Sequence, residues 1–196
     1  MKTLVLYDTI GGNTENVAIK INDVVSKHSF NSRLVKLDEK VEIEFYDYDL
    51  IFIGSPDVEW LPTQKMMQFL HKEKLFEHRM RGDVLPSAPV RPGRFAVCFA
   101  TFCGAHNGVG EVLSVTQWLA SFCEHIGYTV LDKIHIPGEM RDFGQAKGWI
   151  NAERLKELNT FGRLGNIIGR PNEQDLFELE ERINGLLTYL NFYRTK

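Results

Sequence analysis

The sequence predicts an α/β protein in which a five-stranded parallel sheet lies between two layers of helices. Three observations carry this prediction. Five apolar runs alternate with segments whose apolar residues recur at helical spacing. The run Leu50 to Ile53 is continuously apolar, as in strands buried on both faces. The chain of 196 residues is long enough to bury a substantial core. We therefore expect one domain over residues 1–196, built as a three-layer, doubly wound sandwich with right-handed crossovers.

The expected elements alternate along the chain. Strands are expected at about residues 4–7, 32–37, 48–55, 94–101 and 128–136. Helices are expected at about residues 15–28, 62–73, 111–125 and 173–190. Pro62 favours the first turn of the second helix, which we expect to be about eight to twelve residues long. A connection is expected over 77–93 because of its breakers Gly82, Pro86, Pro89, Pro92 and Gly93.

The segment 139–172 stands outside this alternation. It is polar and rich in glycine, with one short helix expected at 152–158. Loops of this length are usually functional or form contacts, so we expect it to pack on the body of the protein or on a second copy of the chain. The side chains expected to supply this contact are Trp149, Phe161, Ile167 and Ile168.

Composition and charge exclude several classes of function. The formal net charge of −3 offers no basic stripe for nucleic acid. No apolar run approaches the roughly 20 residues that span a bilayer. Met1 leads directly into the first strand, so no signal peptide is expected. The three cysteines, Cys98, Cys103 and Cys123, cannot all pair within the chain and lack metal-ligand spacing. We expect reduced thiols, a cytoplasmic location and no metal site.

A short polar loop joins the first strand to the first helix. It consists of Thr9, Ile10, Gly11, Gly12, Asn13 and Thr14. The two glycines let backbone amides approach a ligand, and the helix start adds unpaired N–H groups and a positive dipole end. The loop has no Lys or Arg and no G-x-G-x-x-G pattern, which excludes the nucleotide-triphosphatase and Rossmann loops. It predicts a cradle that binds one phosphate through neutral donors.

The stretch Tyr7 to Glu15 resembles the phosphate loop of the flavodoxin family, usually Ser/Thr-x-Thr-Gly-x-Thr, which holds the phosphate of flavin mononucleotide (FMN). Gly11 replaces the central Thr of that pattern and removes one hydroxyl donor. The resemblance covers most of residues 1–137 and the final helix. It implies FMN as cofactor, the strand order 2-1-3-4-5, and a site where this order reverses between strands one and three. An ordinary glycine-containing turn is the alternative.

The loop after the third strand contains a tryptophan between two prolines. Its broad apolar face suits a planar ring, and the loop resembles the flavodoxin loop whose aromatic side chain covers the isoalloxazine. The alternative is that Trp60 packs over the next helix. The related quinone reductases have a glycine between the prolines, and this chain has none. The candidate flavin-binding residues here are Ser55, Pro56, Asp57 and Trp60.

The loop after the fourth strand has small residues that let the backbone run close to a ring. Thr101-Phe102 and His106-Asn107-Gly108 resemble the second flavin loop of the family. His106 is either a flavin or substrate contact or a surface residue, and Cys103 is either a reactive thiol or a small apolar filler. The candidate binding residues of this loop are Thr101, Phe102, Cys103, Gly104, His106 and Gly108.

The resemblance implies an FMN-binding redox protein in which the flavin carries the chemistry, so no residue is assigned a catalytic role. One hypothesis is an NAD(P)H-dependent oxidoreductase that acts on a small acceptor such as a quinone. A second is an electron carrier to a protein partner. A third is a flavin-free interaction module, since fold does not fix function. The expected partners are FMN, NAD(P)H or a redox protein, and a second copy of the chain.

Overall fold

A computed structural model describes residues 1–28, 30–38, 40–84, 87–141 and 150–194. The described residues form one sheet of five strands, and every neighbouring pair is parallel. The strand order is β2-β1-β3-β4-β5, so the predicted parallel sheet and the order 2-1-3-4-5 are confirmed. The strands are β1 (Lys2–Tyr7), β2 (Asn31–Lys36), β3 (Leu50–Pro56), β4 (Phe95–Phe102) and β5 (Thr129–Pro137).

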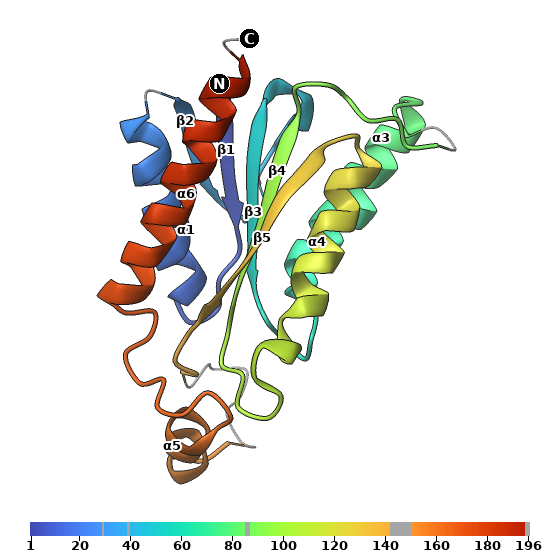
Figure 1. Cartoon of the computed structure of the whole chain (residues 1–196). Helices are drawn as coiled ribbons and strands as arrows, with labels where there is room; N and C mark the ends of the chain where they lie inside the picture. The colour runs from blue at the N-terminus through green and yellow to red at the C-terminus, as the bar shows by residue number, and fades with distance from the viewer. Residues whose placement is uncertain (29, 39, 85–86, 142–149, 195–196) are drawn as a thin grey trace.

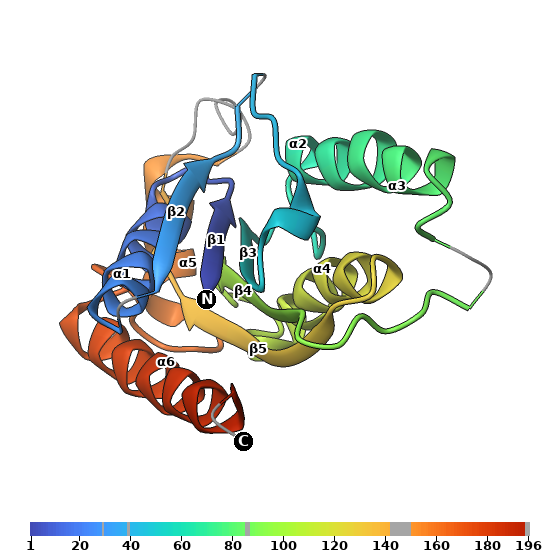
Figure 2. The ribbon, with the colours of Figure 1, turned by 90° about the horizontal axis from the view of Figure 1, so that it is seen from above.

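Helices cover both faces of the sheet (Figures 1 and 2). The helices α1 (Asn13–Lys27) and α6 (Glu173–Arg194) cover one face. The other face carries α4 (Leu113–His125) and a continuous helical stretch made of α2 (Gln64–Met67), η2 (Gln68–Leu75) and α3 (Phe76–Met80). Two short turns, η1 (Phe45–Asp47) and η3 (Gly108–Glu111), and the helix α5 (Ala152–Phe161) complete the elements. The three layers match the predicted sandwich.

Each strand supplies side chains to two separate cores. Leu4 and Leu6 of β1 pack in the core under α4, whereas Val5 and Tyr7 pack in the core under α1 and α6. Successive side chains of a strand point to opposite faces, and both faces of this sheet are covered. This is why the central strands are apolar at consecutive positions rather than at alternate ones.

The second helix is longer than the sequence predicts. It continues to Met80, so the expected connection over 77–93 was wrong for residues 77–80. The stretch 68–75 is a π-helix with Phe69, Leu70 and Leu75 buried, and of these Leu70 and Leu75 lie five positions apart. This spacing fits the i to i+5 hydrogen bonds of a π-helix and falls outside the α-helical period by which helices are recognised in a sequence.

The segment after β5 packs on the carboxyl edge of the sheet, where α5 lies (Figure 1). Ile167 is buried there as expected, and the Arg163 N–H donates to the Ala105 carbonyl at 2.8 Å. Phe161 and Ile168 are exposed, so they supply no such contact within this chain, and their packing on a second copy stays a prediction. Trp149 lies outside the described residues. Within the described part of the chain, no helix is long and apolar enough to cross a membrane.

Candidate functional site

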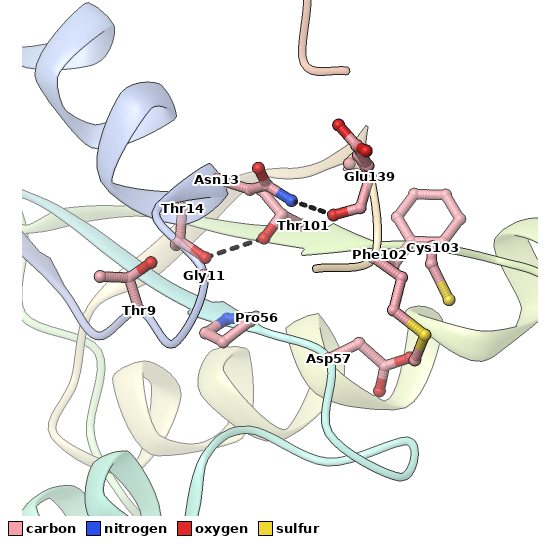
Figure 3. A pocket seen from close by; sticks show the side chains of 12 residues that line it. Thr9, Gly11, Asn13, Thr14, Pro56, Asp57, Thr101, Phe102, Cys103 and Glu139 are labelled. Atoms are coloured by element: carbon pink, nitrogen blue, oxygen red, sulfur yellow. Dashed lines mark hydrogen bonds between the residues drawn. The ribbon is translucent and has the colours of Figure 1, made fainter. Parts of the chain in front are cut away.

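A pocket opens at the carboxyl edge of the sheet, beside the point where the strand order reverses between β1 and β3 (Figure 3). Ligands of doubly wound proteins bind at this place. The empty volume of the pocket is ≈ 390 Å³, open solvent at its mouth included. Its lining consists of Thr9, Gly11, Asn13, Thr14, Pro56, Asp57, Thr101, Phe102, Cys103, Gly138, Glu139 and Met140.

The first wall of the pocket is the turn from β1 into α1. Gly12 stands at the start of α1 with φ 89°, a left-handed conformation that favours glycine. Its N–H donates to the Thr9 hydroxyl at 3.0 Å. Among the described residues, no side chain caps the start of α1. The first turn of this helix therefore presents unpaired N–H groups and a positive dipole end, which favour an anion.

Two buried hydroxyls meet at the pocket, one from the first turn of α1 and one from the end of β4. The Thr14 and Thr101 hydroxyl oxygens are 2.8 Å apart, although the residues are 87 positions apart in sequence. Each hydroxyl has one proton, and the bond between them uses only one of the two. The pair therefore keeps one proton to donate elsewhere. Figure 3 shows both side chains at the pocket.

The Asn13 side chain contributes both a donor and an acceptor. Its Nδ2 donates to the Glu139 carbonyl at 2.9 Å (Figure 3). Its Oδ1 is buried and has no hydrogen-bond partner among the described residues. An unsatisfied buried acceptor costs about 1–3 kcal/mol, and a ligand that donates a hydrogen bond here would recover this free energy.

Asp57 places a carboxyl group on the opposite wall, directly after β3. Its side chain accepts the Trp60 N–H, and its Oδ1 is buried without a partner among the described residues. Burial raises the pKa of Asp57 from its ordinary value of 3.8 to about 7, and the nearby Glu111 carboxylate adds to the increase. The group therefore exchanges a proton near neutral pH and can donate or accept at the pocket.

Replacing Asp57 by asparagine is expected to flatten the dependence of stability on pH. The folded-state pKa lies above the unfolded one, so the contribution of Asp57 to stability is full below about pH 4 and is lost as pH rises through about 7. One pKa unit corresponds to about 1.4 kcal/mol, and solvent screening reduces the total. We expect Asp57→Asn to gain about 1–2 kcal/mol over the parent at about pH 8 and nothing at about pH 4.

Urea denaturation of the parent and the variant across this pH range measures the effect. Glu59, an exposed carboxylate in the same loop, provides the matched control. The free energy of unfolding of Glu59→Gln should differ little from that of the parent at every pH. If the free energies of unfolding of Asp57→Asn and the parent differed by the same amount at every pH, the raised pKa of Asp57 would be contradicted.

The tip of the loop after β3 is a tight turn. Val58 and Leu61 pair as an antiparallel bridge, and Glu59 and Trp60 between them have φ 52° and 67°. Two positive φ values define a type I′ turn, which normally takes Asn and Gly and costs free energy with other residues. The Ser114 hydroxyl donates to the Trp60 carbonyl and ties the turn to α4. Trp60 is 57% exposed, so the interpretation of its indole as a packing residue is wrong.

The structure brings only part of the predicted site together. Ile10 lines a neighbouring hollow with Asp8 and Thr63, and the buried Ser55 hydroxyl accepts the Thr63 N–H at 3.0 Å. His106 is exposed and lines a separate hollow beside α5. The predicted residues outside the lining of the pocket are Ile10, Gly12, Ser55, Trp60, Gly104, His106 and Gly108.

The three cysteines carry free thiols, and two of them, Cys98 and Cys123, are buried in the core. Cys103 lines the pocket. Burial raises its pKa above the ordinary value, so the thiol is protonated at neutral pH. This favours the interpretation of Cys103 as a small apolar filler over that of a reactive thiol.

Sequence reasoning missed the fourth wall of the pocket. It is formed by Gly138, Glu139 and Met140, which follow β5. Arg141 comes next, and its Nη1 donates to the Gly11 carbonyl at 2.6 Å. Their position in the chain could have identified them, because they follow a parallel strand and so lie at the same edge of the sheet as the other three loops. Glu139, Met140 and Arg141 belong to the polar segment 139–172, for which the sequence predicts no part in the site.

The fold is that of a doubly wound α/β protein, with a pocket beside its switch point. No protein family model and no curated protein matches the chain. Solved structures share its fold, among them the following three. A flavodoxin from the domain Archaea matches with a TM-score of 0.60 and 14% identity, covering 97% of this chain and 99% of that chain. A Streptococcus pneumoniae flavodoxin matches with a TM-score of 0.53 and 12% identity, covering 93% and 99%.

The third is the rubredoxin oxygen:oxidoreductase from Desulfovibrio gigas. It matches with a TM-score of 0.56 and 11% identity, and the likeness covers 97% of this chain but 36% of that longer chain. At such low identities the likeness shows the fold alone. The predicted flavodoxin-like fold is therefore confirmed.

Proposed function

We propose that this protein binds FMN in the pocket at the switch point and acts as a redox protein. The observation that carries the proposal is the convergence, in one pocket, of an uncapped helix start with unsatisfied acceptors on Asn13 and Asp57. A phosphate needs the donors of the helix start. The ribityl hydroxyls and the ring N–H of a flavin are hydrogen-bond donors, and they could pair with the unsatisfied oxygens of Asn13 and Asp57. Two of the proteins with the same fold are flavodoxins, which supports the proposal.

The proposal assigns the predicted residues to two parts of FMN. Thr9, Gly11, Gly12, Asn13 and Thr14 hold the phosphate and the adjoining ribityl chain. The ring takes the remaining walls, formed by Pro56, Asp57, Thr101, Phe102 and Cys103, with Trp60 covering it from the loop tip. Ser55 acts indirectly, because its hydroxyl holds the Thr63 N–H at the start of α2. Bound FMN supplies one- and two-electron redox chemistry, and the protein supplies binding and electrostatics.

We further propose that the protein is an NAD(P)H-dependent oxidoreductase with a small acceptor such as a quinone. A second hollow supports this version, because it shares Thr9 with the pocket and has an empty volume of ≈ 1140 Å³, open solvent included. Thr63, Gln64, Lys65 and Gln68 give it polar groups for a second reactant. The alternative, an electron carrier, is favoured by the exposed Trp60, since exposed aromatic side chains suit a protein partner.

Fluorescence titration of the apoprotein tests the proposal. We expect FMN to bind in a one-to-one complex with its emission quenched, and Trp60→Ala to restore part of that emission if the indole stacks on the ring. Absence of FMN binding would contradict the proposal and favour a flavin-free interaction module. Stopped-flow mixing of the holoprotein with NADH and NADPH then separates the two versions: the oxidoreductase bleaches the flavin rapidly, and the carrier does not.

Location and assembly follow the same proposal. Three free thiols suit a reducing compartment, so we propose the cytoplasm. A homodimer is also a proposal, and sedimentation of the holoprotein tests it. Fractionation of the producing cells, with the protein recovered outside the cytoplasm, would contradict the proposed location.

A further inference from the structure

Four residues after β5 cross the start of α1. We call Gly138, Glu139, Met140 and Arg141 the strap. The Gly138 N–H donates to the Phe102 carbonyl at 2.8 Å, and the Glu139 carbonyl accepts from Asn13 Nδ2 at 2.9 Å. Arg141 Nη1 donates to the Gly11 carbonyl at 2.6 Å. The strap is thus bonded to both the phosphate loop and the end of β4.

The strap is held in place from the side away from the pocket. Asn159 of α5 is buried, and its Oδ1 accepts the Met140 N–H at 2.8 Å while its Nδ2 donates to the Met140 carbonyl at 2.7 Å. The Glu139 N–H donates to the Arg170 carbonyl at 2.8 Å. Both backbone groups of Met140 are therefore satisfied by one side chain. These two hydrogen bonds fix the backbone of Met140 and therefore the position of the next residue, Arg141.

The strap brings a cation to a loop that has none of its own. The loop Thr9 to Thr14 contains no Lys or Arg. Of the neighbouring cations, Lys36 lies 3.3 Å from the Glu15 carboxylate and Lys65 lies 4.0 Å from the Asp8 carboxylate. Arg141 Nη1 instead lies 3.3 Å from the point where a side chain on Gly12 would begin. Its guanidinium has five N–H donors, and its one hydrogen bond to a described residue is the bond to the Gly11 carbonyl.

We propose that the strap closes the phosphate end of the pocket and that Arg141 supplies the cation that binds the phosphate of FMN. This inference rests on the proposed function. The flat guanidinium can donate to the Gly11 carbonyl and to a phosphate oxygen at the same time, which a lysine ammonium cannot do with the same geometry. Asn159 is the positioning residue, because it acts on the ligand only through Met140. The strap, held by α5, thus completes the site from outside the usual alternation of strands and helices.

The first test compares Arg141→Gln with the parent in FMN and riboflavin titrations of the apoprotein. Loss of a charge-assisted bond to a phosphate should weaken FMN binding about tenfold or more, while riboflavin, which has no phosphate, should bind both proteins equally. The FMN affinity of the variant should also depend less on salt concentration. Arg154→Gln, an exposed arginine paired with Glu157 in α5, is the matched control and should change neither affinity.

The outcomes separate this inference from the proposed function. Unchanged FMN affinity in Arg141→Gln, with FMN bound by the parent, overturns the role of Arg141 and leaves FMN binding intact. If the parent binds no FMN, the proposed function fails. Inorganic phosphate then decides the inference: a Tm increase in the parent that is lost in Arg141→Gln supports an anion site at the strap, and no increase in the parent overturns it.

Discussion

Replacing Thr14 by valine is expected to weaken FMN binding about tenfold to 150-fold and to leave riboflavin binding unchanged. The Thr14 hydroxyl is fully buried and lies 2.8 Å from the Thr101 hydroxyl. The valine removes the Thr14 hydroxyl as a donor at the pocket, together with the bond between the two residues. A hydrogen bond to a charged group such as a phosphate contributes about 1.5–3 kcal/mol, which corresponds to the stated range of affinities.

The matched control for this variant is Thr14→Ser. Serine keeps the hydroxyl and removes only a methyl group, so FMN affinity should stay within about threefold of the parent. Fluorescence titrations with FMN and riboflavin give both sets of constants. Equal losses for the two ligands in Thr14→Val would show that the loop does not bind the phosphate. The valine should also lower the free energy of unfolding by about 1–2 kcal/mol, because Thr101 loses its partner in a buried place.

Replacing Gly54 by alanine is expected to lower the free energy of unfolding by about 3 kcal/mol or more. Gly54 lies on β3 between Tyr7 of β1 and Phe99 of β4. A Cβ atom on Gly54 would come within 2.1 Å of two carbons of the Phe99 ring. This ring is fully buried in a closely packed core, so neither it nor the strand can move away without loss of packing.

Gly185→Ala is a control for which the expected change in the free energy of unfolding has the opposite sign. Gly185 lies within α6, and a Cβ atom there would meet nothing within 4 Å. Alanine in a helix interior should therefore stabilise the protein by about 0.5–1 kcal/mol. Urea denaturation measures both variants. A midpoint for Gly54→Ala equal to that of the parent, with an unchanged slope, would mean that the Phe99 ring does not pack on Gly54.

The sequence could predict those features that depend on neighbouring residues. Continuous apolar runs mark buried parallel strands, and the turn from β1 into α1 follows from glycines placed between a strand and a helix. Gly127 follows the end of α4, where it has φ 87° and its N–H is bonded to the Glu124 carbonyl, as is common for glycine at a helix C-terminus. The continuation of the second helix to Met80 was not predicted, because Leu75 follows Leu70 by five positions, outside the α-helical period.

The sequence by itself determined the class of fold, the order of its elements and the loops that meet at the switch point. The tertiary structure alone decided which side chains of those loops face the pocket and which are turned away, as with His106 beside α5. It also decided that Arg141 reaches Gly11 across 130 positions and that Asn159 holds Met140. Apolar periodicity is a local property of the chain and can be recognised in the sequence, whereas hydrogen bonds between distant polar groups depend on how the segments are brought together in space.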